Sequence, residues 1–122
     1  MKRVMLKHGP LEKKVQRELR AMGMRYQCHD RSLPGRPDIV LPKQRVVIFV
    51  DGDFWHGWRL PAWEHKLSDF WRKKLRANRI RDQRNFRRLR KRGWRVIRIW
   101  GHHLREDGRL THILRDMRRR SA

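Results

Sequence analysis

The chain has 122 residues, which is enough for one domain with a single hydrophobic core. Its 34 Lys and Arg residues outnumber its 12 Asp and Glu residues, and the formal net charge is +22. Because so many like charges repel one another in a compact state, this surplus indicates a polyanionic partner, with nucleic acid first. On charge alone, a ribosomal or chromatin-like binding protein ranks above an enzyme.

An anionic membrane surface is a weaker candidate for the partner. No stretch has the length and apolar character of a spanning helix, and the N-terminus lacks a signal pattern. The single cysteine, Cys28, excludes an internal disulfide and fits a reducing compartment. We therefore expect no membrane contact and a cytoplasmic location associated with the nucleoid.

The first predicted helix follows a basic segment, residues 1–9. Gly9-Pro10 opens this helix, because proline is favoured at the first helical position, and Gly23 ends it. Glu12 falls in its first turn, where a carboxylate interacts favourably with the helix dipole. The apolar face has helical spacing and consists of Leu11, Val15, Leu19 and Met22.

Strands are predicted next. Met24–Cys28 is expected to form a short edge strand, and His29-Asp30-Arg31 a polar turn. Cys28 and His29 alone make too small a cluster for a metal site. Two apolar runs, Ile39–Leu41 and Val46–Val50, then predict a short strand and a fully buried one.

Ionisable residues mark the ends of these two runs. Asp38 stands where the first begins, Asp51 follows the second, and His56 comes five residues later. Just before them, Pro37 is expected to hold Arg36 in an extended conformation. Antiparallel strands joined by a tight turn bring the start of one beside the end of the other. We therefore predict that Asp38 and Asp51 meet at one sheet edge. With His56 on the exit loop, such a pair suits a divalent metal ion and a general base.

Neither a helix nor a strand period fits the segment from Asp51 to Lys66, which is predicted as a loop. Aromatic side chains on a loop more often pack in a small satellite core than contact a ligand. Here a strongly basic chain surrounds them, and flat apolar side chains can wedge between base steps and kink a duplex. The aromatic residues are Phe54, Trp55, Trp58 and Trp63.

A long helix is predicted from Leu67 to Lys91, ended by Gly93. Asn78 and Asp82 fall on its apolar stripe, where polar side chains need partners. They either tie the helix to the core by hydrogen bonds, which we favour, or face the cleft. The stripe contains Leu67, Trp71, Leu75, Phe86 and Leu89. The other face has almost no acidic residue and suits a phosphate-tracking surface; it carries Arg72, Lys73, Arg76, Arg79, Arg84, Arg87, Arg88 and Lys91.

The last predicted elements are a strand at Trp94–Trp100 and a helix from about Leu110 to Arg118. Residues 118–122 form a basic tail that we expect to be disordered and to contact phosphate. The order of helix, three strands, helix, strand and helix predicts a single α/β sandwich domain over residues 1–122, with a mixed sheet.

Several motifs resemble the very-short-patch (Vsr) repair endonucleases. They are L-P-G-R-P-D-I-V from Leu33, V-I-F-V-x-G-x-F-W-H ending at His56, and the later F-W-x-x-K, N-x-x-R-D and G-W-R-V. The resemblance covers roughly Leu11 to Trp100. It implies the restriction-endonuclease-like αβββαβ core of the PD-(D/E)xK nucleases, an α/β/α sandwich, and a bacterial enzyme that nicks DNA at T·G mismatches.

The resemblance also implies the site. Asp38 and the backbone carbonyl of Val50 would bind Mg²⁺, with Mn²⁺ as a possible substitute. His56 would activate the water, and Glu12 would belong to the active site. Asp51 stands where the family usually has a second histidine, and it would either bind the metal or cost some general-acid function.

Other family features differ in this chain. Asp53 occupies the place of the superfamily lysine. The positions of the family's structural zinc ligands lack cysteine, so no structural zinc is expected. Only nine residues precede the first helix, so most of the N-terminal arm that clamps the mismatch is expected to be missing.

The expected partner is double-stranded DNA, mismatched by resemblance, and other repair proteins are further candidates. Phe54 and Trp55 match the family's paired aromatic residues that intercalate beside the mismatch. The full set of expected DNA contacts is Phe54, Trp55, Trp58, Trp71, Arg36, Arg72, Lys73 and Arg76.

Three functions stay open at this point. The first is a Mg²⁺-dependent endonuclease that nicks one strand at T·G mismatches. The second is a relative of the homing or defence type that cuts unmismatched DNA, which the altered Asp51 and the short arm would suit. The third is a basic DNA-binding module without catalysis.

Overall fold

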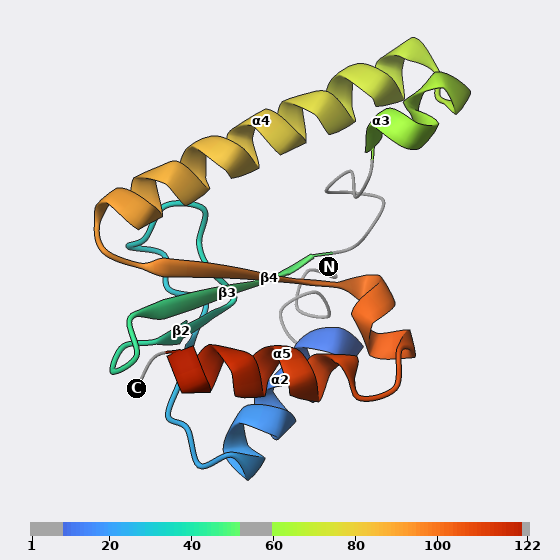
Figure 1. Ribbon diagram of the computed structural model, residues 1–122. Coiled ribbons are helices and arrows are strands. Elements are labelled where there is room, and N and C mark those ends of the chain that lie inside the picture. The colour runs from blue at the N-terminus through green and yellow to red at the C-terminus, as the bar shows by residue number, and fades with distance from the viewer. Residues whose placement is uncertain (1–8, 52–59, 121–122) are drawn as a thin grey trace.

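The computed structural model describes residues 9–51 and 60–120 (Figure 1). The predicted elements are present, with three short additions, two before the long helix and one after β4. In chain order they are α2 (Pro10–Ala21), β1 (Gln27–Cys28), β2 (Ile39–Leu41), β3 (Val46–Asp51), α3 (Leu60–Trp63), the 3₁₀ turn η1 (Glu64–Lys66), α4 (Asp69–Lys91), β4 (Arg95–Trp100), the 3₁₀ turn η2 (Gly101–Arg105) and α5 (Arg109–Arg120).

The four strands form one mixed sheet in the order β1-β2-β3-β4. The first three strands pair antiparallel, and β4 joins β3 in parallel, so Val50 lies opposite Ile99. Helix α4 lies on one face of this sheet, and α2 and α5 lie on the other (Figure 1). The predicted α/β sandwich with a mixed sheet is confirmed.

Strand β3 is buried on both faces because alternate side chains enter two separate cores. Val46 and Ile48 pack with residues of α2 and α5, including Leu19 and Leu114. Val47 and Phe49 instead pack with two residues of α4, Phe86 and Leu89. A continuous apolar run is therefore what this strand requires.

The L-P-G-R-P motif is a turn that packs against α4. Gly35 has φ +77°, and a Cβ there would lie 3.2 Å from atoms of both Asn85 and Phe49. Arg36, predicted as extended, has φ 51°, because its N–H closes a turn onto the carbonyl of Leu33 at 3.1 Å. Proline at the next position restricts but does not forbid this conformation.

Some predicted boundaries are wrong. The edge strand shrinks to Gln27–Cys28, and part of the segment predicted as loop is helical, at Leu60–Trp63 and Glu64–Lys66. The tail predicted as disordered from residue 118 continues α5 to Arg120, since Arg119 and Arg120 pair with Asp116 one helical turn earlier. No helix in the described ranges is long and apolar enough to cross a membrane.

Candidate active site

Among the described residues, Glu12, His29 and Asp38 form a group with the donor atoms of a metal site. One ligand atom from each lies within 4.8 Å of the other two. Nε2 of His29 is 2.9 Å from Oε2 of Glu12. The group combines two carboxylates with an imidazole, and such donors bind divalent cations.

Three elements that are separate in sequence bring the group together. Glu12 lies in the first turn of α2 and is 4% exposed. His29 directly follows β1 and Asp38 directly precedes β2. The β1–β2 register pairs Cys28 with Ile39, so the next residues along, His29 and Asp38, lie opposite each other. The N–H of His29 donates to the carbonyl of Asp38 at 3.0 Å, which fixes this juxtaposition.

Glu12 is the electrostatically perturbed member of the group. Burial, and then the nearby charge of Asp38, raise the pKa of Glu12 from 4.5 to about 7, although His29 and the amide of Gln16 oppose the rise. Nε2 of Gln16 donates to Oε2 of Glu12 at 3.2 Å. Burial also raises the pKa of the Cys28 thiol, and Glu12 and Asp38 add to that effect. A bound cation would offset the charge that these groups share.

Asp38 is also tied to the end of β3. Its Oδ2 accepts a hydrogen bond from the backbone N–H of Val50 at 2.7 Å. The peptide of Val50 therefore lies next to the Glu12–His29–Asp38 group. That the Val50 carbonyl binds a metal ion stays a prediction.

Asp51 contacts the α4 side of the sheet. Its Oδ2 accepts from Nε of Arg98 at 2.7 Å, and Nη2 of Arg98 also donates to Asp82 at 3.3 Å. The sequence predicts that Asp51 meets Asp38 at one sheet edge. The register pairs Ile39 with Ile48, so Asp38 lies opposite Phe49 and Asp51 lies two residues further on. That Asp51 binds metal stays a prediction, as does the alternative that it costs general-acid function.

Two of the predicted DNA contacts have intramolecular roles. Nε and Nη2 of Arg76 donate to the two carboxylate oxygens of Glu64, each at 2.7 Å. Arg72 donates to Asp69 at 2.9 Å and to the carbonyl of Leu67 at 3.1 Å. These arginines therefore hold the turn that leads into α4.

The other predicted DNA contacts that the structure describes lie on α4 and in the motif turn, and the rest fall outside the described residues. Lys73 on α4 and Arg36 in the motif turn are exposed. Trp71 is half-buried and meets Phe70 edge-on at 5.4 Å between ring centroids. His56 lies outside the described residues, as do the predicted DNA contacts Phe54, Trp55 and Trp58.

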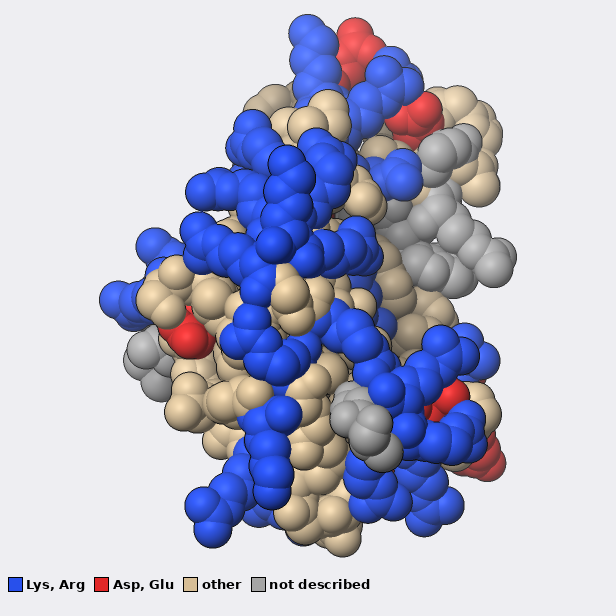
Figure 2. Space-filling model, turned by 60° about the vertical axis from the view of Figure 1, so that its left-hand side comes forward, with Lys and Arg blue, Asp and Glu red and all other residues tan. Residues whose placement is uncertain are grey.

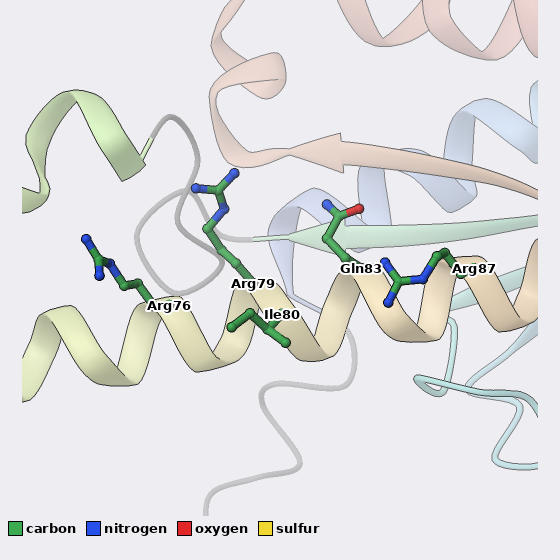
Figure 3. Close-up of a pocket in the computed structure, with 5 residues that line it drawn as sticks. All are labelled: Arg76, Arg79, Ile80, Gln83 and Arg87. Atoms are coloured by element: carbon green, nitrogen blue, oxygen red, sulfur yellow. The ribbon is translucent and has the colours of Figure 1, made fainter.

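A surface hollow of about 350 Å³ lies along α4 (Figure 3). Successive turns of the helix supply its lining: Arg76, Arg79, Ile80, Gln83 and Arg87. Ile80 is 66% exposed, which is unusual for a large apolar side chain on a basic helix. Figure 2 shows one side of the molecule on which Lys and Arg side chains predominate and acidic ones are few.

Sequence reasoning missed His29 because it was weighed only with its neighbour Cys28. The signal that could have found it is the pairing of two short strands. If β1 ends at Cys28 and β2 starts at Ile39, antiparallel pairing places His29 beside Asp38. Asp38 and Glu12, both expected at the active site, are brought together as the other members of the group.

The fold and this group define the chain as an α/β domain of the nuclease type. A family described as "DNA mismatch endonuclease Vsr" matches residues 1–61. The "Type II nicking enzyme V.XorIIP" of Xanthomonas oryzae is 41% identical over 119 residues, which cover 96% of this chain and 88% of that protein. The "DNA mismatch endonuclease Vsr" of Escherichia coli is 36% identical over 116 residues, which cover 91% of this chain and 72% of that protein. The chain belongs to the Vsr endonuclease family.

Proposed function

We propose that this chain is a metal-dependent DNA endonuclease that nicks one strand by phosphodiester hydrolysis, with T·G mismatches as its substrate. The observation that carries the proposal is the Glu12–His29–Asp38 group beside the end of β3. Support for the nicking activity comes from relatives named mismatch endonuclease and type II nicking enzymes that align over most of the chain.

The donor set fits a divalent cation. Burial, and then the charge of Asp38, raise the pKa of Glu12, so this pair of carboxylates gains from a nearby positive ion, and oxygen donors suit Mg²⁺. When bound, Mg²⁺ would supply electrostatic stabilisation of the charge that develops on the phosphate. Asp38 would hold the ion, and the N–H of Val50 keeps the Asp38 carboxylate in one orientation.

Proton transfer falls to His56 in this proposal. In the metal-free protein Glu12 has a pKa of about 7, so its carboxyl would release a proton near neutral pH when the ion binds. His56 would act as the base that activates the attacking water, as its place in the F-W-H motif implies. An imidazole with an unperturbed pKa of about 6.5 is suited to this role.

The basic side of α4 is the proposed DNA-binding surface. Arg79 and Arg87 line the hollow of Figure 3, and within the described ranges neither forms a salt bridge. Their guanidinium groups are therefore available to phosphate oxygens. Phe54 and Trp55 would insert beside the mismatch, which opens the duplex at the reacting strand.

A second candidate is a nicking enzyme of the same fold that acts on matched duplex. Several relatives are named type II nicking enzymes, which favours keeping this candidate. The aspartate at position 51, which is paired with Arg98, is a further departure from the family pattern.

The experiment uses two duplexes of the same sequence, one with a T·G mismatch and one fully paired, each labelled on one strand. The proposal predicts a nick in the thymine-containing strand of the mismatched duplex, dependent on Mg²⁺. Equal nicking of both duplexes would remove the mismatch specificity and leave the matched-duplex enzyme. Absence of nicking with either Mg²⁺ or Mn²⁺, together with tight and salt-sensitive binding, would leave only a DNA-binding module.

A further inference from the structure

We propose that His29 binds the metal ion together with Glu12 and Asp38, and that this nitrogen donor makes the site prefer a transition ion such as Co²⁺ to Mg²⁺. The inference rests on the proposed function, because it concerns the metal of the same site. It adds a residue and a metal preference that the Asp38–Val50 pair does not supply.

The spacing of the donor atoms fits adjacent ligands of one ion. In an octahedral site with bonds of about 2.1 Å, neighbouring ligand atoms are about 3.0 Å apart and opposite ones about 4.2 Å. Nε2 of His29 and Oε2 of Glu12 are 2.9 Å apart, the separation of neighbours. All three donors lie within 4.8 Å, so small side-chain rotations place them around a common point.

The backbone holds His29 in this position. His29 has φ 54°, in the left-handed region, and its N–H is bonded to the carbonyl of Asp38. The side chain of His29 is 29% exposed, whereas that of Glu12 is 5% exposed. The group is therefore open to solvent on the His29 side, from which an ion can enter.

The chemistry of the donors sets the preference. Carboxylate oxygens accept Mg²⁺ and Mn²⁺, but an imidazole nitrogen favours ions later in the first transition row. The ratio of Co²⁺ affinity to Mg²⁺ affinity should therefore be larger for one imidazole and two carboxylates than for a set of oxygen donors alone. The alternative is that His29 only donates a hydrogen bond to Glu12 and stays outside the coordination sphere.

The substitution His29→Gln separates the two roles. Glutamine has a similar reach, can still donate to Glu12, and offers a carbonyl oxygen in place of the nitrogen. The measurement is the affinity of the DNA-free protein for Co²⁺ and for Mg²⁺ by calorimetry, with the visible absorption of bound Co²⁺ as a second readout. Neither readout requires nicking activity.

If His29 is a ligand, His29→Gln weakens Co²⁺ binding at least tenfold, leaves Mg²⁺ binding within about threefold, and changes the Co²⁺ absorption. His112→Gln, on the exposed side of α5, is the matched control and should change neither affinity. Cys28→Ser, tested in the same way, should leave the Co²⁺ spectrum intact, because a thiolate ligand is not part of the proposal.

Unchanged Co²⁺ affinity and absorption in His29→Gln would overturn the inference. The inference would also be overturned if His56→Gln lost the preference for Co²⁺ and His29→Gln kept it, since the nitrogen donor would then be His56. Asp38→Asn distinguishes this failure from failure of the proposed function. If Asp38→Asn abolishes Mg²⁺ binding and nicking while His29→Gln has no effect on Co²⁺, the endonuclease proposal stands and His29 is only a hydrogen-bond partner.

Discussion

Asp51 and Arg98 form a partly buried ion pair between neighbouring parallel strands, with 2.7 Å between Oδ2 and Nε. The same guanidinium reaches Asp82 on α4 at 3.3 Å and lies 4.2 Å from the ring centroid of Trp100 and 4.9 Å from that of Phe86. One cation therefore joins the end of β3 to β4 and α4. It lies on the sheet face that α4 covers, while the carboxylate of Asp38 accepts from the backbone N–H of the adjacent Val50.

Removing this cation should destabilise the protein strongly. Arg98→Met removes the guanidinium from Asp51, whose side chain is 5% exposed, and from the half-buried Asp82. Removing the cation from a buried carboxylate in this way costs about 3 kcal/mol or more. The free energy of unfolding from urea titrations measures the loss. Arg90→Met, on the exposed side of α4, is the control and should change stability by less than about 0.5 kcal/mol.

The double variant Asp51→Asn with Arg98→Met checks the cause. If the cost of Arg98→Met comes from the uncompensated Asp51, the double variant loses less stability than the sum of the two single variants. Additive losses would mean that Arg98 stabilises the fold through ring packing alone.

The raised pKa of Glu12 predicts a pH-dependent stability in metal-free protein. The folded state holds the Glu12 proton up to about pH 7, whereas an unfolded chain releases it near pH 4.5. The folded state therefore binds more protons in this window, and the contribution of Glu12 is full below pH 4.5 and is lost as pH rises through 7. The slope from one such group is at most about 1.4 kcal/mol per pH unit.

Glu12→Gln isolates that contribution because glutamine does not titrate. The free energy of unfolding of both proteins is measured from pH 4 to pH 8. As pH rises, Glu12→Gln should become more stable relative to the wild type. A flat difference over this range would show that the pKa of Glu12 is ordinary. Saturating Mg²⁺ should lower the pKa and move the wild-type loss to lower pH.

DNA binding should depend on the arginines of the α4 hollow in a salt-sensitive way. In the double variant Arg79→Gln with Arg87→Gln, the slope of log affinity against log salt should become shallower by about 2, close to one unit for each lost phosphate contact. Fluorescence anisotropy of a labelled duplex at several salt concentrations measures this slope.

The matched control for that measurement is Arg109→Gln with Arg115→Gln. It removes the same charge from exposed positions of α5. Its slope should stay close to wild type. Equal changes in the two double variants would show that net charge matters and that the α4 hollow is not a specific contact.

Periodicity and motif residues were enough to predict the helices, the strands and their order. A 3.6-residue apolar spacing marked α2 and α4, and a continuous apolar run marked β3 as a strand buried on both faces. The short helix α3 and the turn η1 were missed because local periodicity does not specify them. Contacts made from α4 by Arg72 and Arg76 to Glu64 hold this segment.

The candidate site was predicted less completely. Glu12 and Asp38 could be named from the resemblance, but His29 joins them only through pairing of two strands that are ten residues apart in sequence. The side of the sheet that Asp51 faces depends on register, which a shift of one residue would reverse. A sequence signal for its partner was present, since Arg98 is a charged residue in an apolar strand and requires a buried acid.

The most direct test of the central claim is the single-turnover nicking rate of Asp38→Asn on a mismatched duplex at saturating Mg²⁺. Asparagine keeps an oxygen for the Val50 N–H but removes the charge that would hold the ion. The account predicts a fall of about 10³-fold or more, equivalent to about 4 kcal/mol, with Asp107→Asn on the exposed surface at the wild-type rate. A wild-type rate for Asp38→Asn would contradict the assignment of the Glu12–His29–Asp38 group as the metal-binding active site.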